Sequence, residues 1–182
     1  RRPGALTRGP RDCGPPLPGV EVRIRDGAIE VRGPTLLTGY HGQAAPALDP
    51  DGFFRTGDAG FLDEAGHLHV LGRRDRMIVT GGENVAPIEV EEALAACPGV
   101  QAACVFGVPD ETWGQIVAAA LVAEDPAAPP DGRAILDAIA PKLAPFKRPR
   151  LVAWLDALAS LPSGKPDLAA IEAAAAGRLR PP

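Results

Sequence analysis

The sequence predicts an α+β protein in which an all-β segment precedes a small α/β domain. Two patterns support this prediction. Through about residue 72, short stretches of alternating apolar and polar residues are separated by turn-forming Gly, Asp and Pro, which is typical of β-hairpins. After residue 76, strand-like and helix-like stretches alternate over roughly 105 residues, a usual size for one domain. We therefore expect the trailing hairpins of a large N-terminal domain, followed by a domain with a mixed sheet and packed helices.

The first part begins with an irregular stretch rich in Pro, Gly and Arg, residues 1–19. Two hairpins are predicted after it, one around an Arg-Asp-Gly turn and one around the turn DEAG. Between them we expect a loop. Its DPDG sequence at 49–52 favours a turn over a calcium loop, because a third acidic ligand and a distal Glu are absent. The predicted strands are 20–24, 28–32, 59–62 and 67–71.

The second part has clear element boundaries. The double glycine at 81–82 turns the chain back after a short strand. Pro87 suits the first position of a helix, the acids after it suit the positive end of the helix dipole, and Gly99 lies just beyond the expected helix end. The stretch 124–132 is a Pro-rich linker. The predicted strands are 77–79, 100–107, 115–123 and 150–155. One helix is predicted to begin near residue 87, and two others to cover 133–143 and 167–176.

The composition argues against several classes of protein. The net charge is −4 and no long Lys or Arg block occurs, so nucleic acid is not an expected partner. The longest apolar run, 116–123, is too short to span a bilayer. The chain begins without Met and without an apolar secretion signal, so we expect a cut start and a cytoplasmic protein. Its three cysteines form no C-x-x-C pair and are expected to be inert thiols in that reducing compartment.

Three motifs point to a function. They read FFRTGDAGFLDEAGH at 53–67, GRRDRMIVTGGENVAPIEVEE at 72–92 and LPSGKPD at 161–167. In this order they closely resemble the C-terminal part of the AMP-forming acyl- and aryl-CoA synthetases, which belong to the adenylate-forming superfamily. The resemblance extends over nearly the whole chain. It implies the end of a large AMP-binding domain over residues 1–72, a hinge at 73–76 and a mobile C-terminal domain over 77–182.

This resemblance implies an ATP-dependent ligation of a carboxylic acid to CoA through an acyl-AMP intermediate. Asp58 suits the ribose, because a carboxylate can accept hydrogen bonds from both hydroxyls of a vicinal diol and Gly57 lets the backbone approach closely. Arg73 is a rigid donor that can reach the same ribose. On spacing alone, Asp58 would be read as an aspartate that caps a turn, and Arg73 as a solvated arginine. The resemblance to the family implies instead that both residues bind the ribose of AMP.

Two further residues are implied to act during the reaction. Asp75 matches the family hinge, whose backbone torsions change when the small domain swings between the adenylating and thioester-forming poses. The alternative is a salt-bridged loop acid. Lys165 has a mobile ammonium that can bridge the substrate carboxylate and the phosphate oxygens, and in the family the Lys of this Gly-Lys motif is the adenylation catalyst. The alternative is an ordinary surface lysine.

A third group of residues is implied to contact CoA. A glycine-rich loop lets the thin pantetheine chain pass against the backbone, although Gly-Gly in a hairpin is otherwise a normal turn. An aromatic ring can stack on adenine, and an arginine can hold the nucleotide phosphates, although a tryptophan is more often part of a core. The residues in question are Gly81, Gly82, Glu83, Trp113, Phe146 and Arg148.

The expected cofactors and partners follow from the same resemblance: ATP, Mg²⁺, CoA and a small-molecule carboxylic acid. No protein metal site is expected, because His67 and His69 share a strand face without a third ligand nearby. The family's phosphate-binding loop, its adenine- and Mg²⁺-contacting residues and its acyl pocket would lie upstream. We therefore expect this fragment to be inactive alone and to pack against the missing N-terminal domain.

The expected acid is of a fatty, aryl or succinylbenzoate type. Two alternatives stay open: an adenylation domain that loads a carrier protein, and a degenerate module that only binds a nucleotide or a partner. Against the first, the hinge region lacks a longer basic loop and no carrier-type Ser motif follows Lys165. Against the second, the four residues Asp58, Arg73, Asp75 and Lys165 are all retained.

Overall fold

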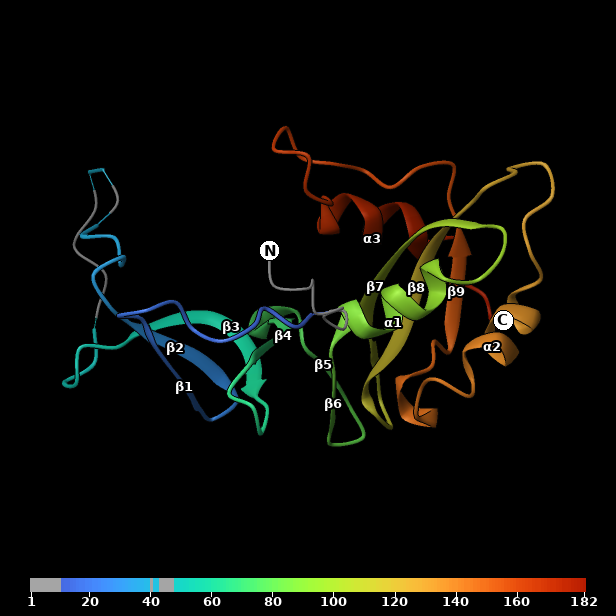
Figure 1. Cartoon of the computed structure of the whole chain (residues 1–182). Helices are drawn as coiled ribbons and strands as arrows, with labels where there is room; N and C mark the ends of the chain where they lie inside the picture. Colours follow the sequence, from blue (N-terminus) through green and yellow to red (C-terminus); the bar gives the residue numbers. More distant parts are fainter. Residues whose placement is uncertain (1–10, 40, 43–47) are drawn as a thin grey trace, which may run out of the picture. The chain divides into compact units, whose positions relative to one another are not determined.

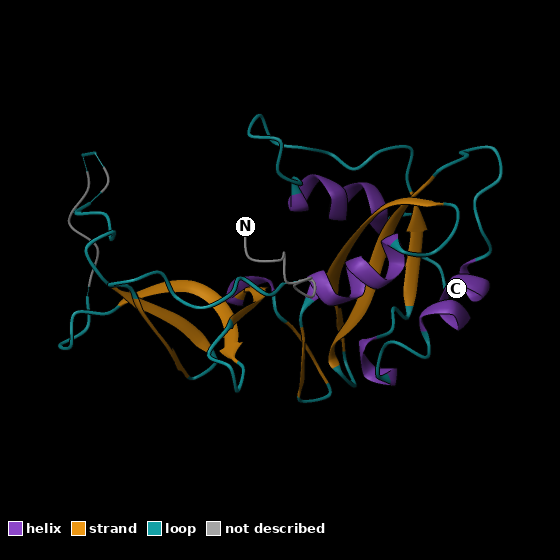
Figure 2. Ribbon diagram, viewed as in Figure 1, coloured by secondary structure: helices purple, strands orange, loops and turns teal. Residues whose placement is uncertain are grey.

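A computed structural model of the chain describes residues 11–39, 41–42 and 48–182 (Figure 1). The chain forms two compact units, Arg1–Asp75 and Arg76–Pro182. Figure 2 shows that the first is built mainly of strands and loops, whereas the second combines a sheet with helices. The predicted α+β class is therefore confirmed. The assignment of residues 73–76 as a hinge stays a prediction. The irregular lead-in at 1–19 falls partly outside the described residues.

The first unit is a four-stranded antiparallel sheet in the order β1-β2-β3-β4. The Asp-Gly turn between the first two strands was expected, and Asp26 and Gly27 both have positive φ, at 51° and 71°. The turn predicted at 49–52 is confirmed, because Gly52 N donates to Asp49 O at 2.9 Å. The four strands are β1 (Glu21–Arg25), β2 (Ala28–Arg32), β3 (Phe54–Leu62) and β4 (Leu68–Arg73).

The predicted start of the third strand at residue 59 is wrong, because β3 begins at Phe54. Val31 of β2 pairs with Phe54 and Glu30 pairs with Arg55, so the polar and glycine-containing stretch before residue 59 belongs to the ladder. A register shift between Ala59 and Gly60 bends the strand. The consequence for function is that Asp58 lies on a strand rather than on a free loop.

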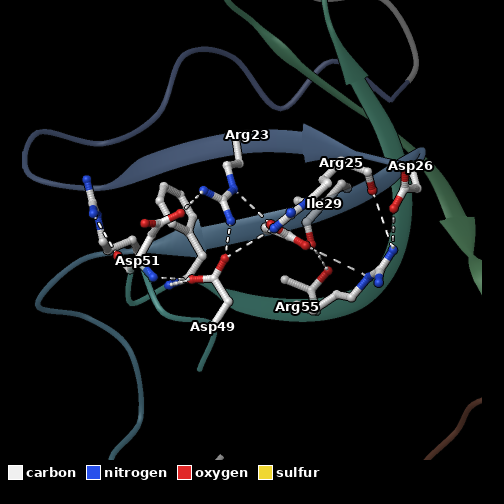
Figure 3. Close-up of polar contacts among 11 residues, drawn as sticks. Arg23, Arg25, Asp26, Ile29, Asp49, Asp51 and Arg55 are labelled. Carbon is white, nitrogen blue, oxygen red and sulfur yellow. Dashed lines mark hydrogen bonds and ion pairs between the residues drawn. The ribbon is translucent and has the colours of Figure 1, made fainter. Parts of the chain in front are cut away.

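Charged side chains take the place of a large apolar core in this unit. Among the described residues of this unit, only four apolar ones are buried: Ala28, Ile29, Phe53 and Ala59. Glu30 is also buried, and Arg23 Nε donates to its carboxylate at 2.8 Å. Figure 3 shows that Arg23 also points to Asp49 and Asp51, with which it forms ion pairs. The ring of Phe53 lies beneath the guanidinium of Arg23, at 3.8 Å from the ring centroid.

Three aspartates with lowered pKa values are expected to make this unit sensitive to acid. Hydrogen bonds from the backbone N–H of Gly14 and of Phe53 lower the pKa of Asp12 and of Asp49 respectively, and the hydrogen bond with His69 lowers that of Asp63. Their folded-state pKa values lie below the ordinary 3.8. Their contribution to stability is therefore complete above pH 3.8 and is lost as the pH falls through the lower folded-state values.

We accordingly expect amide hydrogen exchange in β3 and β4, corrected for its intrinsic pH dependence, to accelerate as the pH is lowered from about 5 to about 2. The substitution Asp63→Asn should flatten this response, because it removes one of the three titrating carboxylates. An unchanged protection of both strands across the range in the unmodified chain would contradict the prediction.

The second unit is a five-stranded sheet in which β8 is the central strand. Strand β7 pairs with one edge of β8, while β5 and β9 pair with the other edge at successive positions, and only β9 is parallel to β8. The strands are β5 (Ile78–Thr80), β6 (Glu83–Val85), β7 (Val100–Asp110), β8 (Gly114–Ala123) and β9 (Leu151–Trp154). The helices are α1 (Pro87–Ala95), α2 (Gly132–Ile139) and α3 (Leu168–Ala176), with short 3₁₀ turns η1 (Arg74–Arg76) and η2 (Pro145–Lys147).

Three details of this unit differ from the prediction. The strand predicted at 100–107 continues to Asp110, where it still pairs with β8. Residues after the double glycine form strand β6, which was not predicted because three residues carry too little pattern. The helix predicted at 133–143 ends at Ile139. Pro141 follows at once, and its missing N–H cannot continue the helical hydrogen-bond ladder.

The two faces of this sheet bury separate apolar clusters. On one face α1 and α2 contribute to a cluster with residues such as Leu94, Ile139 and Leu121. On the other, α3 packs Ile171 against the small side chains of the sheet, including Ala118. Burial raises the pKa of the Cys104 thiol to about 11, so this thiol stays protonated at neutral pH. Within the described residues, no helix is long and apolar enough to cross a membrane.

At Val105, two side chains pair with the outer edge of β7 in place of another strand. Val105, which is fully buried, donates its N–H to Glu91 Oε1 at 2.9 Å. The same oxygen accepts from Arg76 Nη2 at 3.1 Å, and Arg76 also donates to Val105 O at 3.4 Å. The ion pair therefore satisfies both backbone groups that an adjacent strand would otherwise pair with.

Candidate functional site

In the first unit, Asp58 and Arg73 are directly opposite each other on β3 and β4. Their carboxylate and guanidinium lie 3.9 Å apart. Gly57 has φ 83°, and a Cβ at this position would lie 3.2 Å from Arg73 Nη1. The positive φ favours glycine here, and the Arg73 guanidinium lies directly against the position that a side chain would occupy. The backbone N–H of Asp58 donates to Thr56 Oγ1 at 3.1 Å, which fixes the strand at this point.

Arg73 also contacts Asp75, which lies on η1. Its Nη2 and Nε donate to the Asp75 carboxylate at 3.1 and 3.3 Å, and this pairing raises the pKa of Arg73. The salt-bridged acid considered as the alternative reading of Asp75 is therefore observed, and a hinge role stays a prediction.

These residues border a shallow hollow whose lining is mostly cationic. Arg55 and Arg74 line it together with Gly57, Arg73 and Asp75. Three guanidinium groups beside one carboxylate favour an anionic ligand such as a phosphate, and the role of Asp58 at a ribose stays a prediction. The sequence did not single out Arg55 or Arg74. Their placement depends on the register of β2, β3 and β4, which the motif alone does not contain.

In the second unit, Lys165 is exposed on a closed turn that leads into α3. Leu161 N donates to Lys165 O and Gly164 N donates to Leu161 O, both at 2.8 Å. The side chain of Asp167 then caps α3 by accepting from Ala170 N at 3.2 Å. Two backbone hydrogen bonds therefore close the turn that carries Lys165, and the residue itself is exposed.

The predicted CoA loop is the tip of the β5–β6 hairpin. Gly81 and Gly82 have φ 58° and 85°, and Thr80 pairs with Glu83 across the turn, as in a two-residue hairpin connection. Gly81 N donates to Trp113 O at 2.9 Å. A Cβ on Gly81 would lie 2.7 Å from Trp113 Cε3, so a glycine is needed for the indole to pack here. The structure thus brings Gly81 and Trp113 together.

Trp113 is not a core residue, because 41% of its surface is exposed. The guanidinium carbon of Arg150 lies 4.4 Å from the centroid of its ring, in a cation–π contact. Arg150 was not singled out from the sequence. The pairing of β9 with β8 places it here, since Arg150 N donates to Val117 O at 2.8 Å immediately before β9.

Phe146 and Arg148 lie on or next to η2. Phe146 is 36% exposed, whereas the Arg148 guanidinium donates to the carbonyl oxygens of Leu143 and Ala140 at 3.0 and 2.8 Å. Arg148 therefore stabilises the chain that follows α2, and a role in holding CoA stays a prediction. Lys147 joins η2 to α1 through an ion pair with Glu89 at 2.7 Å.

The histidines considered as metal ligands are paired with acids instead. His67 lies 3.4 Å from Asp12, and His69 lies 2.9 Å from Asp63 and stacks on Phe61. In the part of the chain that the structure describes, no three His, Cys, Asp or Glu side chains are grouped so that they could hold a metal ion.

An Arg- and Asp-lined hollow in a β-sheet unit, followed by an α+β unit with an exposed Gly-Lys turn, agrees with the resemblance to the C-terminal part of an adenylate-forming enzyme. Residues 89–165 match the family model described as the AMP-binding enzyme C-terminal domain. The chain belongs to this family.

The similarity to individual proteins agrees with this assignment. A 2-succinylbenzoate–CoA ligase of Listeria monocytogenes is 39% identical over 148 residues, which cover 80% of this chain and 31% of the relative. A feruloyl-CoA synthase of an Amycolatopsis species is 40% identical over 141 residues, covering 76% and 28%. The chain therefore spans about a third of the length of the curated relatives that it matches.

Solved structures are similar over the same part. ATP-bound MatB from Rhodopseudomonas palustris has a TM-score of 0.80 at 35% identity, covering 94% of this chain and 37% of that chain. The o-succinylbenzoate CoA synthetase of Bacillus subtilis, in complex with its acyl-adenylate intermediate, has a TM-score of 0.79 at 36% identity, covering 86% and 34%.

Proposed function

We propose that the protein is an ATP-dependent carboxylic acid–CoA ligase of which this chain is the C-terminal part. In the first step a carboxylate oxygen attacks the α-phosphorus of ATP, and pyrophosphate leaves. In the second step the CoA sulfur attacks the acyl carbon, and AMP leaves. The observation that carries the proposal is the pairing of Asp58 with Arg73 at a cationic hollow in a chain that also exposes Lys165.

The described residues fit these substrates in different ways. Asp58 and Arg73 would hold the ribose of ATP and AMP, and the other arginines of the hollow favour its phosphates. Lys165 would bridge the carboxylate and the α-phosphate during adenylation. The glycine hairpin and Trp113 would hold CoA. Mg²⁺ would accompany ATP, and we assign it to no residue of this chain, because the described residues form no metal-binding group.

Two chemically different steps require different groups beside one phosphate. We infer that the second unit rotates about Asp75, where the first compact unit ends. This rotation would move Lys165 away from the phosphate after adenylation and bring the CoA-binding residues to it. The reaction would take place in the cytoplasm, where ATP and CoA are both available.

The test uses the full-length protein with ATP, Mg²⁺ and a panel of fatty, aryl and succinylbenzoate-type acids, with and without CoA. Mass spectrometry should detect an acyl-CoA and AMP for at least one acid. An acyl-adenylate that CoA does not discharge would favour an enzyme that loads a carrier protein. The absence of both products would favour a module that only binds a nucleotide or a partner.

Replacing Asp58 with alanine should weaken nucleotide binding in both half-reactions. Hydrogen bonds to a charged group contribute about 1.5–3 kcal/mol, which corresponds to roughly 10- to 100-fold in affinity. Calorimetric titration with ATP and with AMP measures the effect. The control is Glu64→Ala, which removes an exposed acid from the turn between β3 and β4. An ATP affinity that is unchanged in the Asp58 variant would remove Asp58 from the ribose site.

A further inference from the structure

Two adjacent residues at the boundary between the units are each tied to their own unit. Asp75 is the last residue of the first unit, and Arg76 is the first residue of the second. In the first unit, Arg73 donates to the Asp75 carboxylate through Nη2 and Nε, at 3.1 and 3.3 Å. In the second, Arg76 Nη2 donates to Glu91 Oε1 of α1 at 3.1 Å and to Val105 O of β7 at 3.4 Å. A single peptide link therefore joins the two anchored residues.

The stability of the second unit does not by itself account for Arg76. Glu91 alone already accepts the hydrogen bond from the buried N–H of Val105. Among the described residues, Arg76 Nε is a buried donor without a hydrogen-bond partner, which costs free energy. A partly buried ion pair of this kind is weak evidence for stabilisation, but it does fix the geometry of the segment that carries it. The contact of Arg76 with α1 and β7 is therefore better explained as a constraint on the backbone at the boundary.

We propose that Arg76 is a positioning residue that confines the rotation of the second unit to the link between residues 75 and 76. This inference rests on the proposed function, in which the second unit rotates between the two half-reactions. Because the peptide bond is planar, ψ of Asp75 and φ of Arg76 are the two soft torsions between the anchored residues. Without the contacts of Arg76, this freedom would extend along the chain to Ile78, where β5 begins.

A rotation about few torsions brings the same groups to the same place in every cycle. Lys165 and the CoA-binding residues belong to the second unit, so additional freedom at its first residue would displace all of them from the reacting phosphate. A misplacement of about 1 Å can reduce a rate about 100-fold. The ribose is assigned to Asp58 and Arg73, which both lie in the first unit. Loss of the constraint should therefore slow both half-reactions and leave the affinity for the nucleotide unchanged.

The experiment compares Arg76→Met with the unmodified full-length protein, because methionine keeps an apolar stem and removes the guanidinium. The kcat of pyrophosphate release and that of acyl-CoA formation from supplied acyl-adenylate should each fall roughly tenfold. The affinity for AMP, measured by calorimetric titration, should not change. Arg76→Lys, which keeps a positive charge for Glu91, should recover part of both rates. Arg133→Met is the control for net charge, because Arg133 is an exposed arginine of the same unit whose ion pair with Asp137 is solvent-exposed.

The variant Glu91→Gln separates positioning from stability. Its amide oxygen can still accept from the N–H of Val105, whereas the negative charge that attracts Arg76 is removed. Both rates should fall in this variant at a temperature at which the protein stays folded. Combined with Arg76→Met, it should be no slower than Arg76→Met alone, because both substitutions remove the same interaction. Rate losses that multiply, or that only follow the unfolded fraction, would overturn the proposal.

Amide hydrogen exchange tests the constraint without catalysis. In Arg76→Met, exchange at residues 76–78 should accelerate at least roughly tenfold, while the β7–β8 ladder keeps its protection. If exchange accelerates in this way but no acid is activated by the unmodified protein, the constraint stands while the proposed function fails. If the protein forms an acyl-CoA but exchange and both rates are unchanged in Arg76→Met, the constraint fails while the proposed function stands. A loss of AMP affinity that accounts for the loss of rate would also refute it.

Discussion

Replacing Lys165 with alanine is expected to slow acyl-adenylate formation by about two to three orders of magnitude. Lys165 is exposed on a closed turn. We propose that its ammonium stabilises the negative charge that develops on the oxygens of the acid and of the α-phosphate during adenylation. Removing one such preorganised donor typically has an effect of this size. Thioester formation from a supplied acyl-adenylate should change little, because that step occurs after the phosphate has been transferred.

The two half-reactions have to be measured separately in the full-length protein. Pyrophosphate release in the presence of an acid reports adenylation, and acyl-CoA formation from synthetic acyl-adenylate reports the second step. Lys142→Ala is a matched control, since Lys142 is also an exposed lysine of the second unit. Equal losses in both half-reactions would rule out a specific role of Lys165 in adenylation.

Replacing Glu91 with alanine is expected to lower the free energy of unfolding of the second unit by about 1–3 kcal/mol, the usual cost of leaving a buried donor unpaired. Glu91 Oε1 is the acceptor for the buried N–H of Val105 and also pairs with Arg76. Glu91→Gln should be less harmful, because the amide oxygen can still accept from Val105.

Chemical denaturation followed by the fluorescence of Trp154, which packs against the core of this unit, measures the difference. Glu92→Ala is the control for the loss of one acid from the exposed face of the same helix. If the glutamine variant were as unstable as the alanine variant, the ion pair with Arg76 would be the dominant interaction and the proposed role of the Val105 hydrogen bond would be wrong.

Much of the fold could be predicted because local patterns coincide with tertiary structure. The Asp-Gly turn between β1 and β2 and the Pro at the start of α1 are examples. The start of β3 was missed because Arg55–Asp58 is polar and glycine-containing, and it becomes a strand only through pairing with β2. The end of α2 was placed too late because an apolar pattern continues beyond Pro141 to Leu143.

The candidate site was predictable only in part for a similar reason. Asp58 and Arg73 belong to recognisable motifs, and their pairing across β3 and β4 brings them together. Arg150 carries no motif of its own. It reaches Trp113 because a parallel strand pairing connects segments that are far apart in the sequence. Conversely, the sequence gives no indication that the Arg148 guanidinium binds two backbone carbonyl groups.

The central position of β8 has a consequence for the order in which the second unit folds. Its hairpin with β7 closes over a turn of a few residues, so this pairing needs little loss of chain entropy. The parallel pairing with β9 must instead close a long loop that contains α2, and it becomes favourable only after β8 is in place. We therefore expect the β7–β8 hairpin to form early in folding. The edge on which Arg150 meets Trp113 would be completed late in folding.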